Sequence, residues 1–228
     1  MPKTYFTPAT FRFLKALERN NSREWFHAHK PDYERHVREP FLELITDIQQ
    51  PLAKISPHYR ADPRKIGGSL YRIFRDTRFS NSKLPYKSWQ DSRFFHERRR
   101  EIQAPGFYLH IQPGYCFAGG GMWHPEPDAL RHVREFLVDN PEAWKRATRS
   151  KAFREHLQLG GESLVRPPRG YDPAHELIDD LKRKDFIATT TFSEELACSD
   201  ELLPWTVNIF QHAAPLVDYL CAAQELEF

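Results

Sequence analysis

The period of the hydrophobic residues changes twice along this chain, and these changes restrict its fold more than any other feature. Over residues 33–55 apolar side chains recur every three or four positions, which is typical of an amphipathic helix. From about Ile66 the period falls towards two. Four segments then have the aromatic-rich, partly alternating pattern of strands, at residues 70–76, 89–95, 107–112 and 115–122. Helical patterns return after residue 125, so the chain is predicted to be an α+β protein.

Turn and capping residues extend this prediction. Pro113 and Gly114 separate the last two strands and favour an antiparallel hairpin. A β-branched segment at 186–192 predicts one more strand, and the Asp172-Pro173 pair predicts the start of a helix that ends near Lys184. We expect a central antiparallel or mixed sheet, covered by helices from both chain ends, in a single domain over residues 1–228. Residues 96–104, which include three adjacent arginines, are predicted to form a solvent-exposed loop.

Composition indicates a cytoplasmic protein that does not contact membranes. The first residues lack the apolar run of a signal peptide, and no stretch approaches the roughly 18 apolar residues of a membrane span. The three cysteines, Cys116, Cys198 and Cys221, are far apart and odd in number. This pattern argues against a disulfide framework and against a zinc ribbon.

Positive charge is concentrated in one part of the chain. Residues 60–100 contain 12 Lys and Arg against four acidic residues, which gives a local charge of +8. Because the whole chain has a net charge of only +2, the other residues together carry −6. Such an asymmetry indicates one electropositive region that attracts an anion.

The densest part of this region is residues 70–89. Arginine offers a planar fork of donors that suits carboxylate or phosphate, and lysine adds a point charge. The candidate anion-binding residues are Arg72, Arg75, Arg78, Lys83 and Lys87. Asp76 lies among them and could orient an arginine or act as a base. The alternative is that Asp76 forms a structural ion pair and that the other charges lie on a solvated loop.

Four segments of the chain are also recognisable. They read FLKALERNNSREWFHAHKPDYE, FRDTRFSNSKLPYK, GFYLHI and AGGGMWHP. With these segments the chain resembles the bacterial and fungal family of domain of unknown function 2461, from about Phe11 to near Pro215. The resemblance implies a fold and a choice of residues, but no reaction. The family usually has an acidic residue where this chain has Ser82, which argues against a mechanism with two carboxylates.

The predicted hairpin supplies further candidates. Tyr108 and His110 share one strand face, where His110 could be a general acid or base or a plain hydrogen-bonding residue. The glycines at 119–121 indicate either a bulged strand beside a pocket or tight packing. Tyr86, Tyr108 and Trp123 are the candidates for shaping a pocket, although Trp123 could also belong to the core.

Other motifs are weaker. Asn21, Arg23 and Trp25 could reach the same cleft, or could simply form a capped helix start. His27 and His29 are two positions apart on a helix and face different directions. The sequence has no HExxH, Walker A or GxSxG motif, so we expect neither a metal nor a cofactor.

Three functions are compatible with these sequence features. The first is a cationic pocket for a phosphorylated or carboxylated small molecule, either as a binding site or as an enzyme in which Asp76 and His110 transfer protons. The second is nucleic-acid binding through the basic and aromatic residues of 60–100. It ranks lower because the isoelectric point of 8.4 is below the range above 9 that is typical of such domains. The third is an interaction module for an acidic partner protein.

Overall fold

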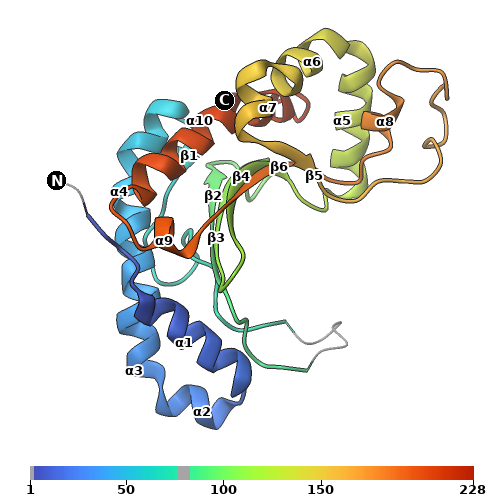
Figure 1. Cartoon of the computed structure of the whole chain (residues 1–228). Coiled ribbons are helices and arrows are strands. Elements are labelled where there is room, and N and C mark those ends of the chain that lie inside the picture. The colour runs from blue at the N-terminus through green and yellow to red at the C-terminus, as the bar shows by residue number, and fades with distance from the viewer. Residues whose placement is uncertain (1–2, 77–82) are drawn as a thin grey trace.

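An antiparallel sheet forms the centre of the chain in the computed structural model, which describes residues 3–76 and 83–228. The order of its six strands is β1-β2-β3-β4-β6-β5 (Figure 1). The strands are β1 (Tyr59–Arg60), β2 (Gln90–His96), β3 (Gly106–Ile111), β4 (Cys116–Met122), β5 (Gln158–Gly160) and β6 (Phe186–Phe192). The predicted α+β class is confirmed, with a sheet that is antiparallel throughout.

The hairpin of β3 and β4 follows the prediction closely. Gly114 adopts φ +73° in the turn, a conformation that glycine reaches without steric cost, and Tyr115 donates its backbone N–H to the carbonyl of Gln112. Tyr108 pairs with Gly119 across the hairpin, and His110 pairs with Phe117. This register determines which side chains of the two strands share a face.

The N-terminal helices begin at well-defined caps. Thr7 forms a capping box with Thr10 at the start of α1, and the Ser22 side chain accepts the backbone N–H of Trp25 at the start of α2. The predicted helix over 33–55 is present, with a π-helical turn at its start. The helices are α1 (Pro8–Arg19), α2 (Arg23–Ala28), α3 (Lys30–Tyr33), η1 (Glu34–Arg38) and α4 (Glu39–Ile55).

The second half of the chain contains α5 (Pro127–Asp139), α6 (Pro141–Arg149), α7 (Lys151–His156), α8 (Ile178–Leu181), α9 (Glu194–Ala197) and α10 (Leu202–Ala222). The predicted helix from 172 to 184 was wrong over most of its length, because only α8 is helical there. Nearby prolines and Gly170, which has φ +91°, favour extended and turn backbone instead. Among the described residues, no helix is long and apolar enough to cross a membrane.

Helix α10 covers one face of the sheet. It packs on β3 and β4 and also contacts α4, α6 and α7, so it is apolar around most of its surface. The ring of Phe210 lies 5.2 Å from that of Phe94 and 5.0 Å from that of Phe107. In Figure 1 both α10 and α4 lie on the same side of the central strands, and the opposite face of β2, β3 and β4 is turned away from these two helices.

The glycine run of β4 is explained by packing. A Cβ atom on Gly119 would lie 2.0 Å from the carbonyl oxygen of Ala188, and one on Gly121 would lie 2.0 Å from that of Phe186. A Cβ atom on Gly120 would meet the Val217 side chain of α10 at 2.9 Å. The three glycines therefore permit the close approach of β6 and α10, which supports the tight-packing interpretation of the sequence.

Two local predictions need correction. Residues 70–76 do not form a regular strand but make two isolated bridges, Leu70 with Ser92 and Phe74 with Tyr86. Residues 96–104 are not simply a solvated loop either: His96 completes β2, and Ala104 is buried. The short strands β1 and β5 were not predicted, because they are too short for periodicity to reveal.

Candidate functional site

The strand register places polar side chains together on the face opposite α10. Asp91 of β2 is directly opposite His110 of β3, and His110 is opposite Phe117 of β4. Phe94 and Phe107 pair with each other, and both contact Phe210 of α10 on the other face. Because side chains alternate along a strand, Asp91 and His110 are directed away from that apolar layer.

A chain of hydrogen bonds joins the polar residues. The Lys87 ammonium donates to Asp91 Oδ1 at 3.0 Å, and the Tyr108 hydroxyl donates to Asp91 Oδ2 at 2.9 Å. The same hydroxyl lies 3.2 Å from His110 Nδ1, and His110 Nε2 lies 2.8 Å from Gln112 Oε1. We call Lys87, Asp91, Tyr108, His110 and Gln112 the sheet-face network.

Burial controls the protonation of this network. Asp91 is only 5% exposed, so its charge is held by the Lys87 ammonium and the Tyr108 hydroxyl rather than by water. Burial raises the pKa of Tyr108, and the negative charge of Asp91 raises it further, so the hydroxyl stays protonated. Burial lowers the pKa of His110 and outweighs the opposing effects of Gln112 and Asp91, which favours a neutral imidazole near pH 7. Within the network, Nδ1 of that ring faces the Tyr108 hydroxyl and Nε2 faces the Gln112 side chain.

Trp89 connects the network to the cationic residues of the 70–89 segment. The Arg75 guanidinium lies 5.4 Å from the Trp89 ring, the Lys87 ammonium lies 5.9 Å from it, and the His110 ring lies 5.7 Å from it. Lys87 also lies 5.1 Å from the Tyr71 ring. The distances of Arg75 and Lys87 from these rings are within the range of cation–π attraction. Two of the predicted anion-binding residues, Arg75 and Lys87, are thus brought together beside one aromatic ring.

Arg75 has one unusual feature. Its Nε atom is buried but has no hydrogen-bond acceptor among the described residues. A buried donor without a partner costs about 1–3 kcal/mol, so most native structures avoid one. This nitrogen is therefore a place where an additional acceptor would be favourable.

The N-terminal helices support the 70–89 segment. The Asn21 side chain donates to the carbonyl oxygen of Tyr86 and accepts its backbone N–H, both at 3.0 Å. The Phe26 ring stacks on the Tyr86 ring at 4.2 Å. Of the two interpretations of the N-terminal motif, the capped helix start is present at Ser22, and Asn21 also contacts the backbone beside the site.

Several predicted site residues lie elsewhere. Tyr86 is 1% exposed and packs on Phe26, so its ring does not line an open pocket. Trp123 follows the end of β4, six residues and about 20 Å beyond Phe117, and it stacks on His124 instead. Arg72 is exposed. Asp76 and Lys83 are exposed beside residues 77–82, and Arg78 lies outside the described residues.

Three residues of the site could not be singled out from the sequence: Trp89, Asp91 and Gln112. All three were assigned only to predicted strands, at residues 89–95 and 107–112. The spacing of Lys87 and Asp91, four positions apart, was the available signal. It could not show that Asp91 pairs with His110, because register depends on the partner strand.

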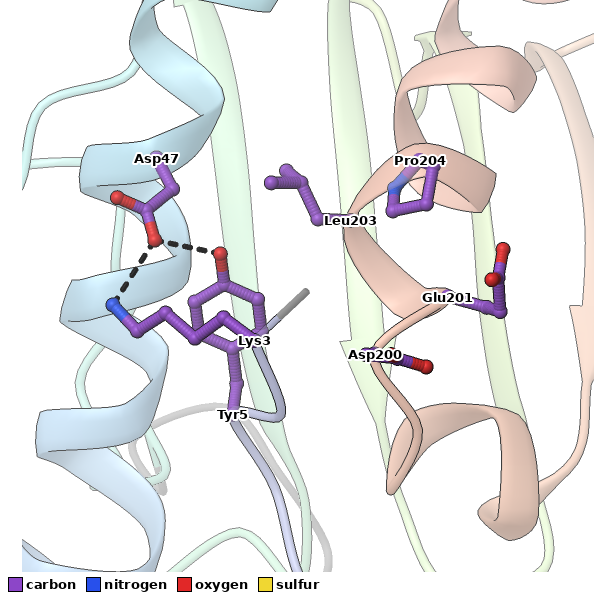
Figure 2. A pocket seen from close by; sticks show the side chains of 7 residues that line it. All are labelled: Lys3, Tyr5, Asp47, Asp200, Glu201, Leu203 and Pro204. Carbon is purple, nitrogen blue, oxygen red and sulfur yellow. Dashed lines mark hydrogen bonds and ion pairs between the residues drawn. The ribbon is translucent and has the colours of Figure 1, made fainter. Parts of the chain in front are cut away.

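Two cavities of the structure lie away from this network. One has a volume of about 420 Å³ and lies between α4 and the start of α10 (Figure 2). There Asp47 accepts hydrogen bonds from the Tyr5 hydroxyl at 2.6 Å and from Lys3 at 3.0 Å, which attaches the N-terminal segment to α4. A second cavity, of about 310 Å³, lies beside Tyr115 and Glu194. Neither resembles the predicted cationic pocket, because acidic side chains contribute to both.

The described residues also contain no group of three or more His, Cys, Asp or Glu side chains arranged to hold a metal ion.

Comparison with protein families adds one result. The model of the family described as "Conserved hypothetical protein (DUF2461)" matches residues 9–219. The chain belongs to this family. No curated protein and no solved structure matches the chain. Within this DUF2461 chain, the matched region contains the complete sheet-face network and both cationic residues beside Trp89.

Proposed function

We propose that this DUF2461 protein binds an anionic ligand on the face of its sheet opposite α10, between Arg75, Lys87 and Trp89. The observation that carries the proposal is the buried Nε of Arg75, which has no acceptor among the described residues. An oxygen of a phosphate or carboxylate would accept this N–H, and charge-assisted hydrogen bonds of this kind are stronger than neutral ones.

The local charge supports an anion rather than a cation as the ligand. The charge of Lys87 is balanced by Asp91, and Tyr108 and His110 are neutral near pH 7, so the charge of Arg75 remains uncompensated within this cluster. The guanidinium also lies beside the Trp89 ring, which restricts its orientation. A planar donor in a fixed orientation is the arrangement that recognises phosphate and carboxylate groups.

The sheet-face network has a positioning role in this proposal. Asp91 holds the Lys87 ammonium through contacts of 3.0 and 3.3 Å, and Tyr108 holds the second oxygen of the same carboxylate. The proton-transfer role that the sequence suggested for Asp76 and His110 stays a prediction. For His110 it requires displacement of Tyr108 from Nδ1 or of Gln112 from Nε2, because each imidazole nitrogen has one of these side chains as its neighbour.

Thermal unfolding tests the proposal. Inorganic phosphate at ten times its dissociation constant stabilises a folded protein by about 1.4 kcal/mol, which raises the melting temperature of a domain of this size by roughly 4 °C. We expect this rise for the unaltered protein relative to sodium chloride of equal ionic strength. Arg75→Gln should abolish the rise without changing the melting temperature in chloride by more than about 2 °C.

Arg154→Gln is the matched control, because Arg154 is an exposed arginine on α7 that makes no ion pair in the described part of the chain. This variant should retain the full rise. Equal rises in all three proteins would indicate a general salt effect. That result, or the absence of any rise and of any heat of binding, would contradict the proposed site.

A further inference from the structure

Four acidic residues on and beside β2 each pair with a cation, and several arginines nearby form no ion pair within the described residues. Asp62 binds Arg64, and Glu101 binds Arg98. Glu97 binds both Arg60 and His58, and Asp91 binds Lys87. In the described part of the chain, no ion pair involves Arg72, Arg75, Arg93, Arg99 or Arg100.

These arginines and Lys87 lie on β2 or on the segments directly beside it, because Leu70 bridges to Ser92 and residues 97–100 follow the end of β2. Tyr71 donates its backbone N–H to the carbonyl of Asp91 near the start of β2, and its ring lies 5.1 Å from the Lys87 ammonium. At the far end of β2 the Arg99 guanidinium lies 3.3 Å from the Phe95 ring. We call Arg72, Arg75, Lys87, Arg93, Arg99 and Arg100 the basic strip.

The positive charges of the strip affect one another. The pKa of Arg99 is lowered first by burial, and then by the positive charges of Arg100 and Arg93. Mutual repulsion of this kind is relieved when a polyanion binds and neutralises several charges together. Since β2 has seven residues at about 3.3 Å each, the strip extends for roughly 20 Å, which exceeds the size of one phosphate group.

Exposed aromatic rings lie beside the cations. Tyr71 is 41% exposed, and Trp89 is partly exposed, with Arg75 at 5.4 Å and Lys87 at 5.9 Å from its ring. Exposed rings beside a line of cations suit a strand with unpaired bases, because each base can stack on a ring while its phosphate contacts a cation. The bases of a duplex are already stacked on one another and cannot use these rings.

We infer that the basic strip binds single-stranded nucleic acid along β2, with bases stacked on Tyr71 and Trp89 and phosphates at the arginines. This inference rests on the proposed function, because the site at Arg75 and Lys87 forms one end of the strip. It specifies the anionic ligand as an extended phosphodiester chain.

Fluorescence anisotropy with a labelled oligothymidylate of about twelve nucleotides tests the inference. We expect the unaltered protein to bind it at least tenfold more tightly than thymidine monophosphate. The double variant Arg72→Gln/Arg100→Gln removes two exposed charges that make no ion pair in the described residues. It should reduce the slope of log affinity against log salt by about 1.4 and leave monophosphate binding unchanged.

Substitutions of Tyr71 provide a second test. Tyr71→Ala should weaken oligothymidylate binding by at least about fivefold, and Tyr71→Phe should retain it, because stacking needs the ring and not the hydroxyl. Unaltered far-ultraviolet circular dichroism and melting temperature would show that both variants fold.

The outcomes separate the two proposals. If monophosphate and oligothymidylate bind with equal affinity and equal salt dependence, the strip is not used and this inference is wrong, whereas the anion site stands. If neither binds, the proposed function itself fails. Tighter binding of a hairpin duplex of the same length would overturn the assignment to single strands.

Discussion

At the residue scale, the feature that organises the site is a buried carboxylate. Asp91 receives the Lys87 ammonium and the Tyr108 hydroxyl, so it holds two side chains from different parts of the chain in one arrangement. Trp89 also brings side chains together, because Arg75, Lys87 and His110 all lie beside its ring. The candidate site therefore depends on two residues of the β2 region that carry no recognisable motif.

Removal of this carboxylate should destabilise the protein. Asp91→Ala leaves a largely buried ammonium and a buried hydroxyl without their acceptor, and we expect the free energy of unfolding to fall by about 3 kcal/mol. Asp91→Asn keeps an acceptor for Tyr108 and should cost less. Urea unfolding measures both changes in the free energy of unfolding, provided that the m value is the same for the variants and the unaltered protein.

The control for this prediction is Glu135→Ala, which removes an exposed partner of Arg131 and should change the free energy of unfolding by less than about 0.5 kcal/mol. An Asp91→Ala protein as stable as this control would show that the network contributes no stability.

At the element scale, the position of the 70–89 segment depends on contacts with elements distant in sequence. The backbone N–H of Lys87 bonds to Ile73, and Asn21 bonds to Tyr86, so the two ends of the segment are connected to each other and to the start of α2. The close approach of β6 to β4 is a second example, since it requires residues without side chains at Gly119 and Gly121.

Gly119→Ala tests this approach. The added methyl group would meet the backbone of β6 at 2.0 Å, and backbone atoms cannot move aside as a side chain can. We expect the free energy of unfolding to fall by about 3 kcal/mol or more. Gly160→Ala in β5 is the matched control, because nothing lies within 4 Å of the added atom, and it should change stability by less than about 0.5 kcal/mol. Equal stability of the two variants would refute the packing explanation of the glycine run.

At the scale of the whole molecule, a single hydrophobic core includes residues from both ends of the chain. Tyr5 near the N-terminus and Leu226 near the C-terminus belong to the same buried cluster as the sheet residues Phe94 and Phe107. Helix α10 contributes to this arrangement because it contacts the sheet, α4 and α6 together.

This shared core leads to a prediction about unfolding. If the chain is one domain, as we propose, thermal unfolding should be a single transition with coincident curves from far-ultraviolet circular dichroism and tryptophan fluorescence. The tryptophans suit the test because Trp25 lies near the N-terminus and Trp205 near the C-terminus. Two separated transitions would contradict a single domain.

The sequence by itself determined the features that depend on neighbouring residues. The α+β class, the hairpin at Gly114, the helix caps at Thr7 and Ser22, and the family all followed from period, turn chemistry and motifs. The basic character of residues 60–100 was also visible, because charge can be counted without a structure.

Only the tertiary structure decided which of these residues meet. The register of β2 and β3 places Asp91 opposite His110, and a shift of one residue would have directed Asp91 into the apolar layer. The Tyr86 side chain packs against Phe26 and does not line the site, whereas Arg75 and Lys87 both lie beside Trp89. The physical reason is that register and burial follow from packing between segments far apart in the chain, and local periodicity carries no information about those partners.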